Sequence, residues 1–557
     1  MSALCYQLRP GAYCDSIVLL QVQKGLAGLP GVLDASAGMA TETNLELLAA
    51  QGLLPAGLGE LAPDDLLVVV RGESEQAALG ALAELDSLLH RRASGGEEED
   101  YRFKSLAAAS RAQPHGRWVL ISVPGRHAAR LAAEALELGR NVFLFSDNVS
   151  LAEELELKRE AAKRGLLVMG PDCGTAIVAG VGFGFANRVP RGGVGLVAAS
   201  GTGLQMVASR LAALGSGVSQ ALGTGGRDLS AEVGGASTLL ALDLLARDPR
   251  TRVIVLISKP PAPAVAARVL AAARATGKPT VVAFLGYVPP LRRLGQLWFA
   301  SSLSEAAELA AGLDSADESA VAATEPAPGS LRALFSGGTL AYEALLGLLP
   351  FLGPISSNLE VEGSLPLPSL AESSGHTLLD LGEDAFTVGR LHPTIDQDLR
   401  LRRFRQEAAD PATGLILLDF VLGDAAHPDP AAEWAPAIEQ VRQGSGPEVV
   451  ALVVGTEEDP QRLSSQVARL SEAGARVFSD SGEALAYLAE RLAAPAQGPT
   501  RPVALEALGT PLTALNLGLE TFAESLAAQG ADVSHVEWRP PAGGNARLLA
   551  ILDRLRR

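Results

Sequence analysis

Three segments of the chain repeat one pattern: an apolar run, a short turn, and a helix rich in Ala and Leu. The runs are RWVLIS at Arg117–Ser122, RVIVLIS at Arg252–Ser258 and VVALVVG at Val449–Gly455. Consecutive apolar residues, without polar alternation, are typical of strands buried on both faces of a parallel sheet. The helix that follows returns the chain in the same direction, as right-handed βαβ units require. The pattern predicts an α/β fold with parallel sheets covered on both faces.

Stretches without apolar periodicity divide the chain. Small, charged and Pro-rich residues bury too little surface to order themselves, and they predict linkers at 91–116, 312–329 and about Ala493–Arg501. We therefore expect a small N-terminal α+β unit at 1–90, a large middle unit, a third unit at 330–492 and a C-terminal tail at 502–557. In the N-terminal unit we expect a helix at Asp15–Lys24 that ends at Gly25, and strands at Gly31–Ala40 and Asp65–Arg71.

Charge and composition exclude several classes of protein. The net charge of −17 argues against a nucleic-acid partner. The three cysteines, Cys5, Cys14 and Cys173, are too widely spaced for a disulfide framework or a zinc cluster, so we expect no metal site. The chain shows neither a signal-like start nor a run of about 20 apolar residues, so we expect a cytoplasmic protein without a membrane partner.

Two Gly-rich turns lie between a strand and a helix, in VGLVAASGTGLQ from Val194 and LRALFSGGTLAY from Leu331. Backbone N–H groups at a helix start have no partner within the helix, and glycine lets an anion approach them. A third turn, Gly223–Asp228, adds the guanidinium of Arg227, which we take as a catalytic candidate. The alternative is ordinary turn and N-cap chemistry. The predicted phosphate- or anion-binding residues are Ser200, Gly201, Thr202, Gly203, Gly223, Gly225, Gly226, Ser336, Gly337, Gly338 and Thr339.

Two further catalytic candidates, His392 and Asp396, lie in RLHPTIDQDLRLRRF. A histidine in a turn can act as a base near pH 7 or orient a substrate carboxylate. The alternative is a capped turn that opens a basic surface helix. Asp419 lies inside an apolar strand, where an unpaired charge would be costly, so it is either paired structurally or near a ligand. Cys173 has no neighbouring base in its segment, which favours a packed structural thiol.

The middle unit resembles the α subunit of succinyl-CoA synthetase in GPDCGTAI (Gly170–Ile177), VGLVAASGTGLQ, GTGGRD and FLGYVPPLRRLGQ. The third unit resembles the carboxyl-terminal ligase domain of the β subunit of that enzyme. The resemblance implies a Rossmann-like CoA-binding-type domain at 117–190 and flavodoxin-like ligase domains at 191–311 and 330–492. It also implies CoA as a possible ligand, although no cofactor is certain from the sequence.

The order of the whole chain, with YCDSIVLLQV, GRLHPTIDQDLRLRRF and LLDFVLGDAAHPDP, resembles the FdrA-type family. Some members of that family are similar to a subunit of oxamate carbamoyltransferase, which acts late in allantoin breakdown. The resemblance implies a subunit that interconverts oxalurate and phosphate with oxamate and carbamoyl phosphate. It further implies a hetero-oligomer with two different partner subunits. The tail resembles the opening segment of a partner, and we expect it to dock near a subunit contact.

One departure from the synthetases bears on the chemistry. In PPLRRLGQLWFA (Pro289–Ala300), Gln296 stands where the α subunits carry the phosphorylated histidine. The ATP-grasp domain of the synthetases is also missing, and no Walker-type motif replaces it. Two alternatives to carbamoyl transfer remain. One is an acyl-CoA synthetase subunit that needs a separate nucleotide-binding partner, and the other is a non-catalytic regulatory or scaffold subunit.

Because an amide cannot form a stable phosphoramidate, we predict no acid-labile phosphoprotein when the isolated chain is incubated with labelled ATP, or with acyl-CoA and labelled phosphate. A succinyl-CoA synthetase α subunit, treated in parallel, is the positive control. Label on any histidine of this chain would contradict the prediction.

Overall fold

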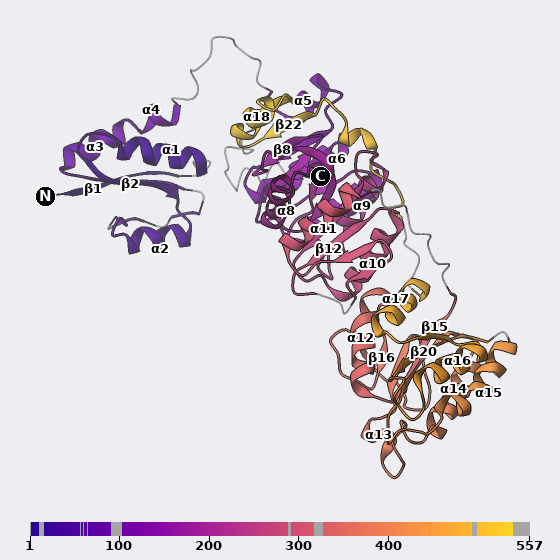
Figure 1. Ribbon diagram of the computed structural model, residues 1–557. Helices are drawn as coiled ribbons and strands as arrows, with labels where there is room; N and C mark the ends of the chain where they lie inside the picture. Colours follow the sequence, from indigo (N-terminus) through magenta and orange to yellow (C-terminus); the bar gives the residue numbers. More distant parts are fainter. Residues whose placement is uncertain are drawn as a thin grey trace, which may run out of the picture. The chain divides into compact units, whose positions relative to one another are not determined.

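The computed structural model describes residues 2–10, 16–55, 57–59, 61–63, 65–90, 103–287, 291–316, 327–444, 446–492 and 498–538. The chain forms two compact units, Met1–Ala108 with Val536–Arg557, and Ala109–His535, and each is described by itself (Figure 1). Cys14, Asp15, Pro289, residues 91–102 and 317–326 of the two longer expected linkers, and the tail after 538 lie outside the described residues.

The first unit is a small antiparallel sheet in the order β1-β3-β2, with helices packed on it. β2 and β3 coincide with the expected strands, but β1 carries polar residues between its apolar ones and was missed. α1 continues through Gly25, so the predicted helix end there is wrong. A Cβ at Gly25 would lie 2.9 Å from the Leu88 side chain, so this glycine allows close helix packing. The elements are β1 (Ala3–Arg9), α1 (Ser16–Ala27), β2 (Val32–Met39), α2 (Glu42–Ala50), β3 (Leu66–Gly72), α3 (Glu75–Ala83) and α4 (Leu85–His90).

A five-stranded sheet follows, in the order β23-β22-β4-β5-β6. β22 comes from the expected tail and pairs in parallel with β4, from Ala514 opposite Trp118 to Leu517 opposite Ile121. The described part of the tail therefore packs into a sheet of this chain. The elements are α5 (Leu106–Ala112), β4 (Trp118–Ile121), α6 (Gly125–Glu137), β5 (Asn141–Leu144), α7 (Leu151–Arg164), β6 (Val168–Met169), β22 (Thr513–Leu517), α18 (Glu520–Ala527) and β23 (Asp532–Val536).

An eight-stranded sheet has the order β13-β14-β12-β11-β9-β10-β7-β8, with β9 between two parallel neighbours. The β7–β8 hairpin pairs with β10, so residues 175–184 belong to this sheet, although we expected them before a boundary at 190. The elements are β7 (Thr175–Val178), β8 (Val181–Gly184), β9 (Arg191–Ala198), α8 (Gly201–Ala213), β10 (Val218–Gly223), α9 (Ala236–Arg247), β11 (Val253–Ser258), α10 (Pro263–Ala275), β12 (Thr280–Phe284), β13 (Arg293–Leu294), β14 (Leu297–Phe299) and α11 (Leu303–Ser315).

A seven-stranded parallel sheet has the order β17-β16-β18-β15-β19-β20-β21. These sheets confirm the predicted α/β class. No helix among the described residues is long and apolar enough to cross a membrane. The elements are β15 (Ser330–Phe335), α12 (Gly338–Leu352), β16 (Ser356–Ser357), β17 (Leu365–Pro366), β18 (Thr377–Asp380), α13 (Asp384–Thr387), α14 (Asp398–Ala409), β19 (Thr413–Val421), α15 (Pro430–Gln443), β20 (Glu448–Val454), α16 (Leu463–Ala473), β21 (Arg476–Phe478) and α17 (Ser481–Leu492).

The packing of the tail against β4 can be tested at Gly518, where φ is +111°. A Cβ added at this glycine would lie 2.5 Å from Ser122 Oγ. We predict that Gly518→Ala lowers the free energy of unfolding by roughly 2–4 kcal/mol, from backbone strain and overpacking together. Gly530→Ala is the matched control, because φ is +84° there and a Cβ would meet nothing within 4 Å. Chemical denaturation followed by circular dichroism measures both. Equal losses would contradict the close contact with Ser122.

Candidate functional site

The carboxyl ends of β9, β10 and β11 bring three turns together at one edge of the eight-stranded sheet. The N–H of Ala199 donates to the Ile257 carbonyl at 2.9 Å, and the N–H of Thr224 donates to the Ala198 carbonyl at 2.8 Å. The structure thus places the Ser200–Gly203 turn beside the Gly223–Asp228 turn, in the position where open α/β sheets bind ligands.

The start of α8 is the most open of the predicted anion sites. Ser200 is its N-cap, and the Ser200 hydroxyl accepts from the Gly203 N–H at 3.2 Å, which is ordinary N-cap chemistry. Gly203 is buried, and a Cβ there would lie 2.8 Å from Ser200 Oγ. Gly201 and Thr202 are exposed, and the nearest atom to a Cβ at Gly201 is 3.8 Å away. An anion can therefore reach the backbone at Gly201 and Thr202.

The glycines of the next turn serve mainly close packing. A Cβ at Gly223 would lie 2.5 Å from Cys173 Sγ, and one at Gly225 would lie 2.6 Å from the Pro171 carbonyl. Gly226 is exposed with open space around it. Burial raises the pKa of Cys173 to about 12, so this cysteine is a packed thiol and not a nucleophile. Within this turn, only Gly226 leaves room for a ligand.

Arg227 lies at the rim of the same turn, held by a buried ion network. Its Nε contacts Glu154 at 2.8 Å, and its side chain is 48% exposed. Glu154 also contacts Lys158, which reaches Asp228 at 2.7 Å. Asp228 accepts from two N–H groups at the start of α9. Asp228 is thus structural, whereas Arg227 is fixed in place with its guanidinium partly open to solvent.

Lys259 also lies at this edge of the sheet, and it was not among the site residues predicted from the sequence. It directly follows β11, is exposed, and forms no ion pair within the part of the chain that the structure describes. An ammonium group near the positive end of α8 would favour a divalent anion. Lys259 could have been predicted from the sequence, because SKPP follows the apolar run of β11 in the same way as ASGTG follows the apolar run of β9.

The second predicted anion-binding turn, at the start of α12, is arranged differently. The Ser336 N–H and hydroxyl donate to the two carboxylate oxygens of Asp419 at 2.7 and 2.8 Å. Arg400 contacts the same carboxylate at 2.7 Å, so Asp419 is a paired structural carboxylate. Gly337 caps the helix without a side chain, and a Cβ at Gly338 would lie 2.9 Å from Asp380 Oδ2. The carboxyl group of Asp380 therefore lies at the start of this helix.

His392 lies next to Asp380, while the Asp396 carboxylate is bound within its own turn. Asp396 accepts from the Asp398 N–H at 3.0 Å, which is turn chemistry. His392 Nε2 and Asp380 Oδ1 lie 2.9 and 3.1 Å from the position of a Cβ at Gly382. Burial raises the pKa of Asp380, Glu383 and Asp419 raise it further, and His392 and the Gly382 N–H oppose the shift. Asp380 could not be predicted as a site residue, because TLLDLG reads only as a strand end.

Gln296 lies at the opposite edge of the eight-stranded sheet from the Gly-rich turns. Its carbonyl accepts from the N–H of Thr280, the first residue of β12, at 2.8 Å. The next residue, Leu297, pairs in parallel with Thr280. The position of the missing phosphohistidine is therefore at the amino edge, whereas the start of α8 is at the carboxyl edge.

The five-stranded sheet does not fit the nucleotide part of CoA. In doubly wound sheets that ligand lies where the strand order reverses, here between β22 and β4. The Ser122 N–H donates to the Leu517 carbonyl at 2.9 Å, and the Leu519 N–H donates to Ser122 Oγ at 2.8 Å. The rings of Phe145 and Phe522 lie 4.9 Å apart. The two loops that border this position are thus bonded directly to each other.

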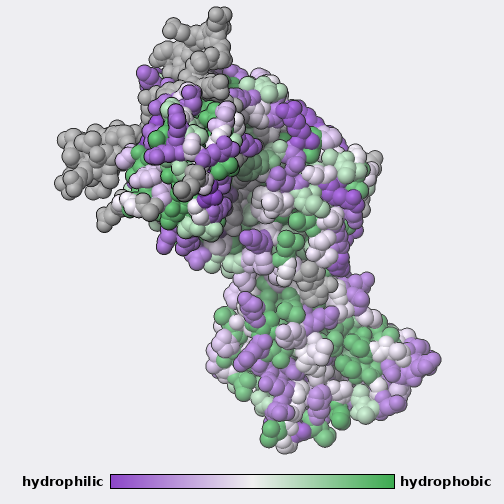
Figure 2. Space-filling model, turned by 90° about the vertical axis from the view of Figure 1, so that its left-hand side faces the viewer, coloured by the Kyte–Doolittle hydropathy of each residue, from purple (hydrophilic) through white to green (hydrophobic). Residues whose placement is uncertain are grey.

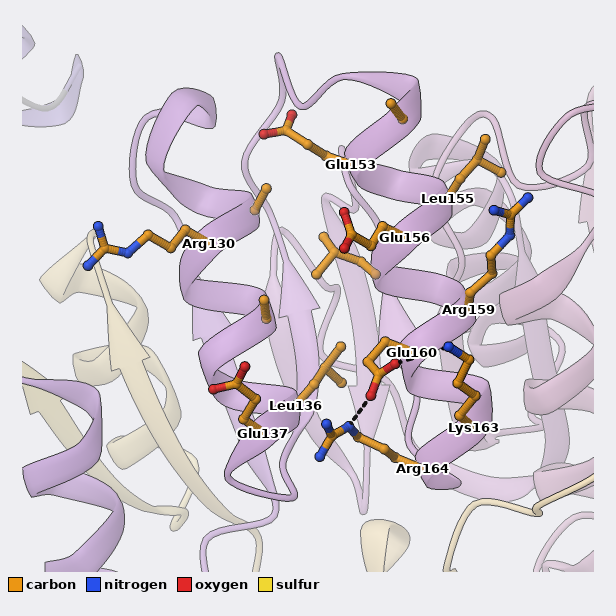
Figure 3. Close-up of a pocket in the computed structure, with 14 residues that line it drawn as sticks. Arg130, Leu136, Glu137, Glu153, Leu155, Glu156, Arg159, Glu160, Lys163 and Arg164 are labelled. Atoms are coloured by element: carbon orange, nitrogen blue, oxygen red, sulfur yellow. Dashed lines mark hydrogen bonds and ion pairs between the residues drawn. The ribbon is translucent and has the colours of Figure 1, made fainter. Parts of the chain in front are cut away.

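A groove of about 840 Å³ lies between α6 and α7, away from these turns (Figure 3). Charged side chains line it, and Glu160 pairs there with Arg164 at 2.6 Å and with Lys163 at 3.5 Å. Figure 3 shows Arg130 and Glu137 extending from α6, and no serine, threonine, cysteine or histidine is among the side chains drawn. None of the predicted site residues lines this groove.

Two family models match the chain. Residues 334–490 match the CoA-ligase model, and residues 1–103 match the model of the AllF heavy metal-associated domain. A soft metal prefers paired thiolates, and Cys5 is the one cysteine among the described residues of the first unit. Burial, with Glu75, raises the pKa of Cys5, and the described residues hold no group of three or more potential ligands.

The chain is 40% identical over 494 residues to the Escherichia coli (strain K12) protein "Uncharacterized protein YahF", covering 85% of this chain and 96% of that protein. Among solved structures, it is similar to the dinucleotide-forming acetyl-coenzyme A synthetase 1 of Ca. Korarchaeum cryptofilum, with 16% identity, a TM-score of 0.29, and 74% and 83% of the two chains covered. It is also similar to the ATP citrate lyase of Methanothrix soehngenii, with 19% identity and a TM-score of 0.30. That comparison covers 38% of this chain and 36% of the other. With TM-scores this low, neither likeness enters the argument.

The role of the Ser200 hydroxyl as a helix cap gives a prediction. Ser200→Ala should lower the free energy of unfolding by about 1 kcal/mol and leave phosphate affinity unchanged. Ser302→Ala is the matched control, because Ser302 Oγ accepts from the Glu305 N–H at 3.2 Å at the start of α11. Denaturation and titration calorimetry measure the two quantities. Lost phosphate binding at unchanged stability would make the hydroxyl a ligand.

Proposed function

Since the chain belongs to the family of Escherichia coli YahF, with a CoA-ligase-type region at 334–490, we propose that it is a subunit of a carbamoyltransferase. It would interconvert oxalurate and phosphate with oxamate and carbamoyl phosphate. The observation that carries the proposal is the open start of α8, where two exposed backbone positions lie at one sheet edge with Arg227 and Lys259. The FdrA-type resemblance and the match to the AllF domain support the context of allantoin breakdown.

In this proposal, phosphate binds at Gly201 and Thr202, with Lys259 and Arg227 balancing its charge. A phosphate oxygen bonds to the carbamoyl carbon of oxalurate, and the bond from that carbon to the oxamate nitrogen breaks. The nitrogen gains one proton and the phosphate loses one, so carbamoyl phosphate and oxamate result. Oriented N–H donors and fixed cations stabilise the charge on the tetrahedral intermediate without a covalent nucleophile.

The acyl-CoA synthetase alternative has less support. The phosphohistidine relay of the synthetases needs a histidine where this chain has Gln296, and the described residues at the β22–β4 junction do not fit CoA. The scaffold alternative does not explain why exposed Gly201 and Thr202, partly exposed Arg227 and exposed Lys259 share one edge of the sheet.

Partner subunits remain part of the proposal. Several large apolar side chains between 365 and 395 are exposed, and Val388 is 83% exposed. Figure 2 shows apolar surface on the part of the molecule that carries the seven-stranded sheet. Such exposure is typical of a surface that another chain covers, which supports a hetero-oligomer with two different partners. The exposed residues are Leu365, Leu370, Val388, Leu391 and Ile395.

The test is phosphate-dependent formation of carbamoyl phosphate from oxalurate by the assembly that co-purifies with a tagged chain. We predict that Lys259→Met lowers this rate about 10- to 100-fold, as expected for the loss of a charged hydrogen-bond partner. Lys163→Met is the matched control, because Lys163 is 73% exposed on α7, away from these turns. An unchanged rate in Lys259→Met would remove the lysine from the site. The absence of any carbamoyl phosphate from a complete assembly would overturn the proposed function.

A further inference from the structure

The three-stranded sheet of the first unit has two edges that differ in their protection. β2 forms one edge, and its pairing with β3 is interrupted by a register shift between Val32 and Asp34. β1 forms the other edge. It pairs with β3 along all seven of its residues, and no described residue pairs with its outer side. Bulges, prolines and lysines usually keep an edge strand from pairing with other chains, and β1 contains none of them.

The apolar side chains of β1 extend a cluster of this unit to the edge of the sheet. Figure 1 shows α1, α3 and α4 on one face of the sheet and α2 on the other. Leu4 and Leu8 are half-buried against the cluster that includes Leu48 of α2 and Val69 of β3. Tyr6 lies between them, opposite Val69 in the register, and is 42% exposed. The apolar row of β1 is thus only partly covered by the described residues.

The two ends of β1 differ in charge. The start of β1 lies opposite the end of β3, and the exposed carboxylates of Glu73 and Glu75 closely follow that strand. Neither glutamate forms an ion pair with a described residue. Arg9 ends β1, and its Nη2 contacts the exposed Asp86 carboxylate at 2.7 Å. The outer edge of β1 therefore has an acidic end and a basic end, and an antiparallel strand with the same charge pattern complements it.

We propose that β1 pairs with β1 of a second copy of this chain, antiparallel and with Tyr6 opposite Tyr6, so that one sheet runs through both molecules. In this register Leu4 of each copy lies opposite Leu8 of the other, and the two apolar rows join on the face of α2. Arg9 of each copy lies at the acidic end of the other. Apolar, aromatic and opposite-charge pairs across strands all stabilise an antiparallel sheet.

Other pairings of two β1 strands fit less well. A parallel pair in register would place Arg9 opposite Arg9 and the acidic ends side by side, which is unfavourable. A shift of the antiparallel pair by one residue would turn one copy over and set Leu4 opposite Gln7, so the apolar rows would lie on different faces. The pairing does not depend on the proposed function, because none of the predicted site residues lies in the first unit.

The experiment is light scattering of the full chain after size-exclusion chromatography at micromolar concentration. We expect a dimer, with twice the mass of 57.5 kDa of one chain. Tyr6→Lys and Tyr6→Glu should each give a monomer, because like charges then lie directly opposite each other. Leu33→Lys is the matched control on the other edge strand, β2, where Leu33 is 55% exposed, and it should remain a dimer.

Mixing the two charged variants tests the register. An equimolar mixture of Tyr6→Lys and Tyr6→Glu should recover the dimer, because position 6 of each copy then meets the opposite charge. Recovery also shows that both variants fold. A Tyr6→Lys chain that stays dimeric, or a mixture that stays monomeric, would overturn the inference. An unchanged chain that is monomeric by itself would also overturn it, and would leave the edge of β1 to a strand of a different subunit.

Discussion

The carboxyl edge of a parallel sheet is the constraint on which this chain depends. Several strands there, β9 and β15 among them, are followed by a helix whose first N–H groups have no partner inside the helix. The eight-stranded and the seven-stranded sheets differ in how they meet this requirement. At α8, Ser200 satisfies one donor and leaves Gly201 and Thr202 exposed. At α12, Ser336 is bound to Asp419, and the carboxyl group of Asp380 stands over the helix start. The two Gly-rich turns thus differ: the start of α8 is open to an anion, whereas a carboxyl group of the chain lies at the start of α12.

The pairing of β22 with β4 is the second long-range feature that shapes function. It joins a strand near the C-terminus to one that begins at Trp118, with Trp118 Nε1 donating to the Ala507 carbonyl at 2.8 Å. The same pairing brings Leu517 and Leu519 onto Ser122, where a nucleotide would otherwise lie. The segment that completes the five-stranded sheet also bonds to the residue that follows β4, which weakens the CoA alternative.

Much of the fold could be predicted because buried parallel strands are apolar along their whole length, as in RVIVLIS and VVALVVG. The turns at the ends of β9 and β15 could be predicted for the same reason. The partners of side chains could not. Ser200 and Ser336 look equivalent in sequence, and only the register of β15 between β18 and β19 shows that Ser336 meets Asp419 and that Asp380 lies beside Gly338. The pairing of the tail with β4 could not be predicted, because it spans almost 400 residues, which no local pattern encodes.

Phosphate binding at the backbone of the α8 start is the step on which the proposed function depends. Amide hydrogen exchange of the full chain at neutral pH, with and without phosphate, tests this step, because bound donors exchange more slowly. We expect phosphate to protect the amides of Gly201 and Thr202 and to leave those of 336–341 unchanged. Protection confined to 336–341, or none in either turn at phosphate concentrations that calorimetry shows to be saturating, would contradict it.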